Sequence, residues 1–455
     1  MDAFVIEGGR PIKGRLRVNG SKNACLPLMA ATLLTDQPVT LRGVPRLADI
    51  ANMQRLLAEL GVDTGASVGD EAFAHLGPAT LTAQPTGEAV SHARYEIVKT
   101  MRASISALGP LVAKRGEARI ALPGGCAIGQ RPVDLHLRGL EAMGAELTLE
   151  SGDIVARAPK DRSGRRRLRG ATIFLSGPSG STVLGTANVM SAATLAQGRT
   201  IIEAAACEPE IADLAVLLNA MGARVRGAGT PRIVIEGVEA LGGAEHHVMP
   251  DRIEAGTYMV AAAITGGRLT LENCPIDALL AFTDRLHEVG VRLEVTDAGD
   301  PLRATCEVWA GARIRPAHVT TQPHPGFPTD LQAPMMALLC LADGNSVVTE
   351  KIFPERFLHV AELSRMGASI FRQGPTAVVT GVSRLVGAPV MASDLRASAC
   401  LVLAGLAADG VTNVHRVYHL DRGYERMEAT LNALGARIER VDAKELDSSA
   451  QAAGA

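Results

Sequence analysis

The stretch from Pro123 to Asp134 holds the residues best suited to chemistry, because it places Cys126 among three glycines with Arg131 five residues later. Glycine allows positive φ and lets a ligand approach the backbone closely, so we expect a loop here. A thiol on a polar loop near a guanidinium can ionise or give up a proton, whereas most free cysteines are small buried hydrophobes. Cys126 is therefore a candidate functional residue, with a buried structural cysteine as the alternative.

Other charged residues stand at the starts of Ala-rich apolar segments, in matching places along the chain. These residues are Lys22, Arg102, Asp251 with Arg252, Asp330, and Asp394 with Arg396. Helix N-termini attract anions through their free amides and the helix dipole. With Arg131 and Arg422 added, the cations of this set are suited to phosphate and carboxylate groups, so a polyanionic substrate is predicted. A capping or surface role is the alternative for each residue by itself.

Asp330 lies in the segment from His324 to Gln332, where two prolines make the approach to the helix rigid. A carboxylate presented in a fixed place can act as a general base. A helix N-cap explains the same residue equally well. The chain contains no GxxxxGK[ST] motif and no GxGxxG after a strand, so a P-loop or Rossmann nucleotide site is not predicted.

The elements that must position these residues form a repeat. An apolar residue, a glycine and a small or branched residue recur at Leu60-Gly61-Val62, Met143-Gly144-Ala145, Met221-Gly222-Ala223, Val289-Gly290-Val291, Met366-Gly367-Ala368 and Leu434-Gly435-Ala436. The pattern is typical of a glycine that caps a helix C-terminus. A second, Ala- and Leu-rich helix is predicted ahead of each, at residues 26–34, 104–112, 188–195, 258–264, 335–341 and 397–406. The predicted unit is β-α-β-α-β-β, repeated six times.

Such units must pack together to bury their helices. Aromatic residues are only 3% of the chain, which favours closely packed small side chains, with Ala-rich helices at the centre and sheets outside. We therefore predict an α/β fold of two domains with three units each. Domain 1 spans residues 22–249, and domain 2 spans 1–21 and 250–455. The N-terminal strand, Phe4 to Glu7, resembles the closing strands of the C-terminal half and is expected to join it.

Composition limits the partners and the compartment. The 455 residues include 46 Lys and Arg against 48 Asp and Glu, so the charge balance indicates neither nucleic acid nor an anionic membrane as partner. No apolar stretch approaches the roughly 20 residues that span a bilayer, and the N-terminus does not read as a signal peptide. The seven cysteines are scattered without a CxxC pair, which disfavours disulfides and structural zinc. A cytoplasmic protein without a metal site or cofactor is expected.

Seven motifs in order along the chain resemble those of the UDP-N-acetylglucosamine enolpyruvyl transferases, also called UDP-N-acetylglucosamine 1-carboxyvinyltransferases. The motifs are Ser21-Lys22-Asn23-Ala24, Lys99-Thr100-Met101-Arg102-Ala103-Ser104, Pro123-Gly124-Gly125-Cys126 with Arg131-Pro132-Val133-Asp134-Leu135-His136, Pro250-Asp251-Arg252-Ile253-Glu254, Phe327-Pro328-Thr329-Asp330, Asp394-Leu395-Arg396-Ala397-Ser398 and Asp421-Arg422-Gly423-Tyr424-Glu425-Arg426. The resemblance implies the inside-out α/β barrel of that family, with the active site in the cleft between the two domains.

The same resemblance implies the reaction. The enolpyruvyl group of phosphoenolpyruvate moves to the 3-hydroxyl of UDP-N-acetylglucosamine (UDP-GlcNAc), with release of phosphate, as the first committed step of peptidoglycan precursor synthesis. By resemblance, Cys126 is the acid that helps to protonate the enol methylene and can carry an adduct, and Asp330 takes the sugar hydroxyl proton. Lys22, Arg131 and Arg422 would hold phosphoenolpyruvate. The remaining substrate-binding residues are Asn23, Arg102, Pro132, Val133, Asp134, Leu135, Thr182, Val183, Ile352, Asp394 and Arg396.

One segment departs from the family pattern. Residues 179–186 stand where many members read Ser-Val-Gly-Ala-Thr, so Thr182 replaces a serine expected near the diphosphate and Leu184 replaces a glycine. The hydroxyl is retained, so the departure concerns the nucleotide contacts and not the reaction. Two alternatives are kept: a transferase like 5-enolpyruvylshikimate-3-phosphate (EPSP) synthase, and a non-catalytic UDP-sugar-binding paralogue. The Cys126 loop argues against the first, and the presence of Lys22, Cys126 and Asp330 against the second.

Overall fold

The six glycines predicted to end helices all adopt the left-handed conformation that glycine alone enters without strain. Their φ angles lie between 79° at Gly61 and 101° at Gly222. The helices that they end are α2 (Ala48–Glu59), α5 (Asp134–Ala142), α7 (Pro209–Ala220), α9 (Leu280–Glu288), α11 (His359–Arg365) and α13 (Met427–Ala433). The computed structural model describes residues 2–65, 79–87, 90–122, 133–178, 180–297, 299–311 and 313–444.

The Ala-rich helices predicted ahead of these glycines are also present. They are α1 (Lys22–Ala31), α4 (Leu108–Arg115), α6 (Val183–Ala193), α8 (Arg252–Ile264), α10 (Gln332–Leu339) and α12 (Leu395–Ala407). In α8 and α10 every residue is buried, as expected for helices that are apolar on all sides. Short 3-10 helices precede α4 and α10, at η3 (Arg102–Ala107) and η5 (Thr329–Leu331). The prediction that these helices form the interior is confirmed.

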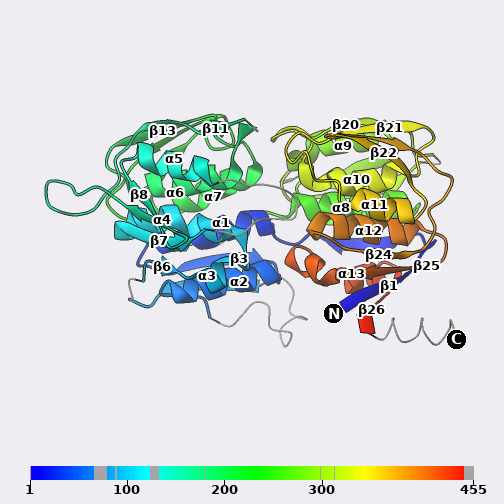
Figure 1. Ribbon diagram of the computed structural model, residues 1–455, viewed down its shortest axis with the longest axis horizontal. Coiled ribbons are helices and arrows are strands. Elements are labelled where there is room, and N and C mark those ends of the chain that lie inside the picture. Colours follow the sequence, from blue (N-terminus) through cyan, green and yellow to red (C-terminus); the bar gives the residue numbers. More distant parts are fainter. Residues whose placement is uncertain are drawn as a thin grey trace. The chain divides into compact units, whose positions relative to one another are not determined.

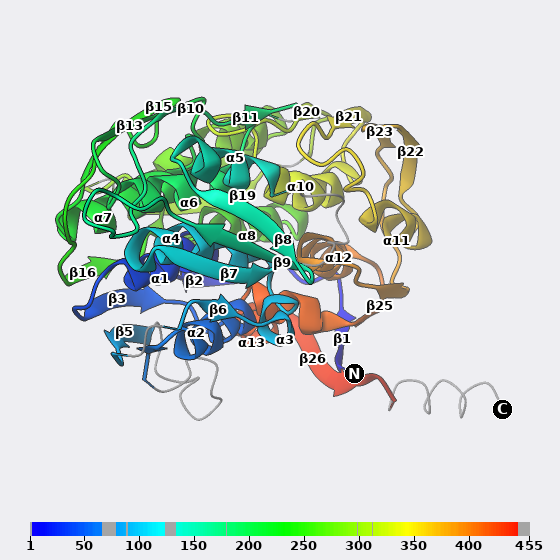
Figure 2. The same ribbon diagram turned by 60° about the vertical axis from the view of Figure 1, so that its left-hand side comes forward.

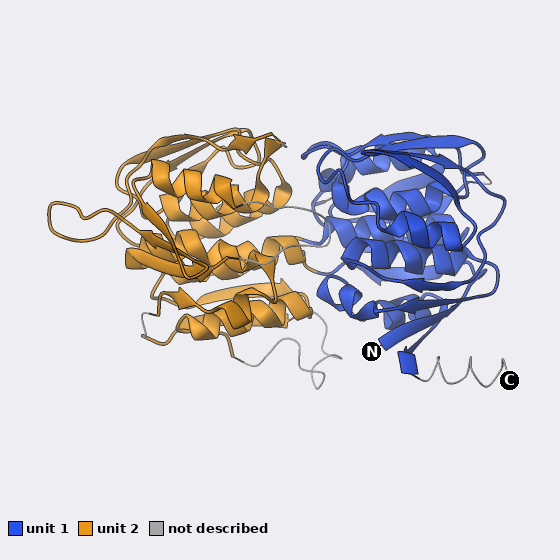
Figure 3. Cartoon of the chain, in the orientation of Figure 1, with its two compact units in different colours: residues 1–19, 127–129, 250–455 blue, residues 20–126, 130–249 orange. Residues whose placement is uncertain are grey.

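The chain divides into two compact units, with boundaries between Asn19 and Gly20 and between Met249 and Pro250 (Figure 3). Each unit has its own hydrophobic core, and each core includes residues from three of the Ala-rich helices. In one unit, α8, α10 and α12 lie between β20 and β21 on one side and β24 and β25 on the other (Figure 1). Figure 2 shows strands β7, β8 and β9 lying across α4 in the other unit.

Six four-stranded sheets cover the helices, three in each unit. In residues 20–249 the sheets are β16 (Ala244–His247), β3 (Val39–Val44), β5 (Ala79–Pro85), β4 (Val62–Asp63); β6 (His92–Ala93), β7 (Glu117–Ala121), β9 (Asp153–Arg157), β8 (Glu146–Glu150); and β10 (Thr172–Phe174), β13 (Arg199–Glu203), β15 (Arg232–Glu236), β14 (Arg224–Arg226), each in spatial order. Strands β11 (Ser176–Gly177) and β12 (Gly180–Ser181) form a separate pair.

The other unit has the same arrangement. Its sheets are β2 (Lys13–Arg17), β17 (Arg268–Cys274), β19 (Ala304–Ala310), β18 (Val291–Asp297); β20 (His318–Thr320), β21 (Asn345–Thr349), β23 (Thr376–Thr380), β22 (Ser369–Gln373); and β24 (Pro389–Met391), β25 (Val411–His415), β1 (Asp2–Glu7), β26 (Arg437–Asp442). In all six sheets the first strand runs parallel to the second and the other pairings are antiparallel. The six-repeat prediction is thereby confirmed.

The N-terminal strand closes the last sheet of the chain. Strand β1 pairs with β25 and β26, with Phe4 opposite Val414 and Arg440. It takes the place that β23 has in its own sheet, as the resemblance to closing strands predicted. The sequence analysis did not find that β16 plays a similar part, since it supplies the first strand of the sheet that contains β3. No helix among the described residues is long and apolar enough to cross a membrane.

Candidate functional site

Asp330 is held by two arginines. It lies in η5, and Arg356 Nη1 donates to its Oδ1 at 2.8 Å while Arg396 Nη2 donates to its Oδ2 at 3.0 Å. The side chains of Arg356 and Arg396 are 7% and 4% exposed, but that of Asp330 is 25% exposed. The two guanidinium groups therefore support the carboxylate from the protein interior while part of it faces solvent.

The N-cap explanation of Asp330 is wrong. Neither η5 nor α10 has a side-chain cap, and the residues before their first turns are Pro328 and Leu331. Asp394 does cap a helix, because its Oδ1 accepts from the amides of Arg396 at 2.9 Å and Ala397 at 3.1 Å. The two aspartates, similar in sequence context, thus do different work.

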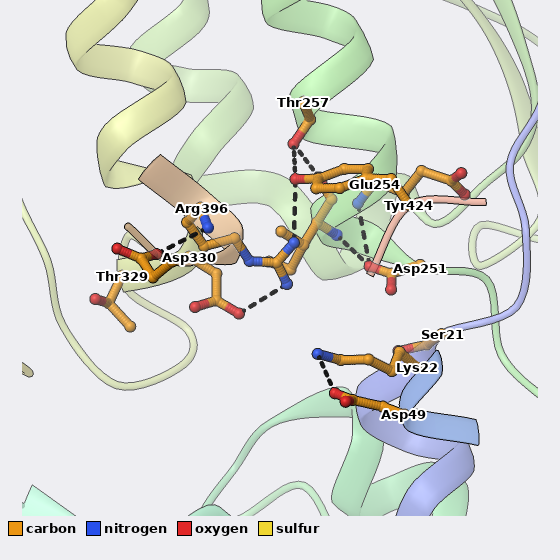
Figure 4. A network of polar contacts seen from close by, with 12 residues as sticks. Ser21, Lys22, Asp49, Asp251, Glu254, Thr257, Thr329, Asp330, Arg396 and Tyr424 are labelled. Carbon is orange, nitrogen blue, oxygen red and sulfur yellow. Dashed lines mark hydrogen bonds and ion pairs between the residues drawn. The ribbon is translucent and has the colours of Figure 1, made fainter. Parts of the chain in front are cut away.

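Arg396 is fixed on its other side by a chain of hydroxyl groups. Its Nη1 donates to Tyr424 Oη at 3.0 Å, and Tyr424 Oη lies 2.8 Å from Thr257 Oγ1 (Figure 4). The Thr257 hydroxyl donates its proton to the carbonyl of Ile253, so the Tyr424 hydroxyl must be the donor to Thr257. All three hydroxyl and guanidinium positions are therefore set by one directed chain of hydrogen bonds from Arg396 to the helix backbone.

Charge and burial act in opposite directions on Arg396. Burial by itself lowers its pKa, but the adjacent Asp330 carboxylate outweighs burial, so the pKa of Arg396 is raised. Burial also raises the pKa of Tyr424, although Arg396 opposes that shift. Both groups keep their protons at neutral pH. Arg396 is consequently a permanent cation beside the carboxylate, and Tyr424 stays a hydrogen-bond donor.

Two more predicted residues lie in the same unit. Ile352 follows β21, and its amide donates to Glu350 Oε1 at 2.8 Å. Arg422 ends the 3-10 helix η6 (Val417–Arg422), two residues before Tyr424, and it helps burial to lower the pKa of His419. Asp330, Ile352, Asp394, Arg396 and Arg422 therefore all stand at or near helix starts and loop ends.

The other unit brings Lys22 together with a partner that the sequence analysis missed. Lys22 is the first residue of α1, and its Nζ lies 3.3 Å from Asp49 Oδ2, with both residues buried. Ser21 caps the helix by accepting from the amide of Ala24 at 3.3 Å. Asn23 is the next residue of the same turn and is partly exposed. The ammonium group is thus held at a helix start by a buried carboxylate.

Arg102 begins η3, which leads into α4. It adds to the burial that lowers the pKa of His136 to about 4, so that His136 is neutral at physiological pH. His136 Nδ1 lies 3.0 Å from Asn188 Nδ2, which also donates to the carbonyl of Ile105 at 2.8 Å. A neutral imidazole that accepts at Nδ1 satisfies this arrangement.

The remaining predicted residues of this unit lie at the starts of α5 and α6. Val133 precedes α5, which begins at the exposed Asp134 and buries Leu135. Thr182 caps α6, its Oγ1 accepting from the amide of Gly185 at 3.2 Å, and Val183 is the first helical residue. The predictions for Cys126, Arg131 and Pro132 fall on residues outside the described ranges.

Several residues of these networks were not predicted. Arg356, Glu350 and Thr329 surround Asp330, and Tyr424 lies inside a motif that was read for Arg422 alone. A charged cluster after the strand that ends at Thr349 was a signal available in the sequence. Asp49 offered no such signal, since an acidic residue in the first turn of a helix is common. Among the described residues no group of three His, Cys, Asp or Glu side chains could hold a metal ion.

Known proteins agree with this architecture and with these motifs. Residues 6–431 match the model of the EPSP synthase (3-phosphoshikimate 1-carboxyvinyltransferase) family. The UDP-N-acetylglucosamine 1-carboxyvinyltransferase of Nitratidesulfovibrio vulgaris strain Hildenborough is 54% identical over 443 residues, which cover 97% of this chain and 99% of the relative. The chain belongs to this family of carboxyvinyltransferases. A second member, from Paracoccus denitrificans, is 53% identical over 441 residues, 97% of this chain and 99% of the relative.

Solved enolpyruvyl transferases share the fold. The enolpyruvyl transferase NikO from Streptomyces tendae superposes with a TM-score of 0.83 at 24% identity, covering 97% of this chain and 99% of that one. EPSP synthase from Acinetobacter baumannii gives a TM-score of 0.72 at 19% identity, covering 97% and 100%. At these identities the likeness concerns the fold alone. The predicted fold class, a two-domain α/β enolpyruvyl transferase fold, is confirmed.

Proposed function

We propose that this chain transfers the enolpyruvyl group of phosphoenolpyruvate to the 3-hydroxyl of UDP-GlcNAc and releases phosphate, the first committed step of peptidoglycan precursor synthesis. The observation that carries the proposal is its identity of 52% to 54%, over 97% of its length, with curated UDP-N-acetylglucosamine 1-carboxyvinyltransferases. The two predicted domains, residues 22–249 and residues 1–21 with 250–455, both contribute residues to the proposed reaction.

The reaction is an addition followed by an elimination. Addition needs a proton at the methylene carbon and removal of a proton from the sugar hydroxyl as its oxygen attacks the neighbouring carbon. Elimination of phosphate from the tetrahedral intermediate reverses these demands on the acid and base. Asp330 is the proposed base, since its carboxylate is partly exposed and both its oxygens are oriented by arginines. Cys126 is the proposed acid, which can also carry a pyruvate-type adduct.

Cations must balance the negative charge of the combined substrates. Lys22, Arg131 and Arg422 are the proposed ligands of phosphoenolpyruvate, and Arg102 and Arg396 complete the cationic surroundings. The buried position of Lys22 at the start of α1 supports its part, because the helix N-terminus adds free amides to the ammonium charge. The reaction requires an acid, a base and cations, so no cofactor enters the proposal.

The sugar nucleotide is assigned to residues that begin helices or follow strands. The proposed contacts are Asn23, Pro132, Val133, Asp134, Leu135, Thr182, Val183, Ile352 and Asp394. Thr182 supports this part with a hydroxyl at an N-cap, although its Oγ1 already accepts from Gly185. A cytoplasmic location belongs to the same proposal. It is supported by the six described cysteines, which are all free thiols, as expected in a reducing compartment.

The test is a phosphate-release assay with purified chain and phosphoenolpyruvate. Phosphate release is expected with UDP-GlcNAc and not with shikimate 3-phosphate, the substrate of the EPSP synthase reaction. The product should be 3-enolpyruvyl-UDP-GlcNAc by mass spectrometry. Turnover with shikimate 3-phosphate but not with UDP-GlcNAc would assign the chain to the alternative reaction, and no turnover with either would refute both.

A further inference from the structure

Glu350 is a buried carboxylate that collects hydrogen bonds from three separate segments. It follows β21 directly and has no exposed surface. Its Oε1 accepts from Thr321 Oγ1 at 2.7 Å and from the amides of Ile352 at 2.8 Å and Phe353 at 3.0 Å. Its Oε2 accepts from Thr329 Oγ1 at 2.9 Å. Four donors therefore compensate a charge that would be costly to bury alone.

One of these donors leads directly to Asp330. Thr329 Oγ1 gives its proton to Glu350 and accepts from Arg356 Nη1 at 3.0 Å. The same Nη1, which carries two protons, donates to Asp330 Oδ1 at 2.8 Å. The path from the Glu350 carboxylate to the Asp330 carboxylate thus runs through one hydroxyl and one guanidinium nitrogen.

The other donors fix the segment that contains Ile352. The amides of Ile352 and Phe353 both point at Glu350 Oε1, so the turn after β21 is closed around this carboxylate. The amide of Lys351 donates to Thr321 Oγ1 at 2.8 Å, which ties the same turn to the strand end at residue 321. A change at Glu350 must therefore be felt both at Ile352 and at Asp330.

We propose that Glu350 is a positioning residue that couples the segment of the proposed base Asp330 to the segment of the proposed sugar-nucleotide contact Ile352. This inference rests on the proposed function, which supplies the roles of those two residues. In this arrangement Glu350 touches neither substrate. It sets the place of the base relative to a contact of the hydroxyl-bearing substrate, on which the rate of a proton transfer depends steeply.

The chemistry of the amide predicts what Glu350→Gln does. A glutamine has one acceptor oxygen and one NH₂ donor in place of two acceptor oxygens. The least disruptive orientation keeps the oxygen where Oε1 accepts three bonds and turns the NH₂ toward Thr329. The Thr329 hydroxyl must then accept from this NH₂, and it can no longer accept from Arg356 in the same way. The disturbance consequently reaches Asp330 through Arg356.

The experiment compares steady-state kinetics of the full chain and four variants in the phosphate-release assay. Glu350→Gln is expected to lower kcat at least tenfold and to raise the KM for UDP-GlcNAc at least threefold, because both segments shift. Thr329→Val removes only the link to Arg356 and is expected to lower kcat at least tenfold with a KM for UDP-GlcNAc within twofold of wild type. Thr329→Ser keeps the hydroxyl and should restore most of kcat.

Thr376→Val is the matched control. It removes a hydroxyl that pairs with Thr349 Oγ1 at 3.1 Å in the same sheet, outside the Glu350 network. Its kcat should stay within twofold of wild type. A Thr329→Val variant as active as wild type, or a Thr376→Val variant as impaired as Thr329→Val, overturns the inference. The threonine variants decide the matter if Glu350→Gln does not fold. A wild-type chain without phosphate release refutes the proposed function and this inference together, whereas an active wild type with an unaffected Thr329→Val refutes the inference alone.

Discussion

The guanidinium of Arg396 lies 3.0 Å from the carboxylate of Asp330, although 66 residues separate them in the chain. Arg396 begins α12 and Asp330 precedes α10, and these two helices belong to the same hydrophobic core. The repeat places both residues at helix starts, and the core packing then brings the starts together. A charge pair of this kind positions a carboxylate more firmly than a single hydrogen bond does.

Asp330→Asn tests the carboxylate as a base. The amide keeps the size of the side chain but cannot take a proton, so kcat is expected to fall by a factor of at least 100, within the usual range for general-base removal. The Kd for UDP-GlcNAc should change by less than about tenfold, since most proposed contacts lie elsewhere. Phosphate release and calorimetric titration give the two values. A variant with kcat near that of wild type would contradict the assignment.

Tyr424→Phe tests the hydroxyl chain behind Arg396. The phenylalanine ring fills the same buried space and keeps its place 5.5 Å from the Arg396 guanidinium, but Arg396 Nη1 and Thr257 each lose a partner. A loss of about 1 to 3 kcal/mol in the free energy of unfolding is expected, because a buried donor is left without its acceptor. Urea denaturation measures it. Tyr418→Phe, at an exposed tyrosine, is the control and should stay within about 0.5 kcal/mol of wild type.

Thr182 separates a capping role from a role in substrate binding. Thr182→Ala removes the acceptor for the Gly185 amide, so about 1 kcal/mol of stability should be lost, as for other N-caps. Thr182→Ser restores both the cap and the hydroxyl that the family pattern expects. If the hydroxyl also binds the nucleotide, Thr182→Ala raises the KM for UDP-GlcNAc and Thr182→Ser does not. Equal KM values for both variants would limit Thr182 to the cap.

Much of the fold followed from local patterns. Gly222 and its five counterparts mark helix ends because positive φ is a property of one residue type, and a pattern of that kind needs no tertiary information. Strand β1 was assigned to the right sheet because its alternation matches β23. Strand β16 escaped notice because its sequence, Ala-Glu-His-His, lacks the apolar alternation typical of a strand.

The candidate site was predictable as residue types and not as pairs. Helix starts with charged residues could be read from the repeat, but the partners of those residues could not. Lys22 is 27 residues from Asp49, and Arg356 is 26 residues from Asp330. Such pairs form only when the core has set the direction of each helix, so a motif search finds the residues and misses the contacts. The Glu350 network illustrates this, since its four donors come from residues 321, 329, 352 and 353.

Glu254 gives a prediction about pH. This buried carboxyl group lies in the first turn of α8, where its Oε2 accepts from the amide of Asn19 at 2.7 Å and its Oε1 from Asn19 Nδ2 at 3.0 Å. Burial raises its pKa from 4.5 to about 8, Asp251 adds to the increase, and the two Asn19 donors oppose it only in part. The group therefore keeps its proton at neutral pH in the folded chain.

The sign of the effect on stability follows from the higher pKa of the folded state. Protonation favours the folded chain, so the contribution is complete below about pH 4.5 and is lost as the pH rises toward about 8. Glu254→Gln does not titrate, and its amide can pair with Asn19 after a flip of the Asn19 amide. The stability of wild type minus that of Glu254→Gln should fall between pH 5.5 and 8, with a slope approaching about 1.4 kcal/mol per pH unit, and level off above. Urea denaturation across this range measures the difference, and a difference independent of pH would show that Glu254 ionises normally in the folded chain.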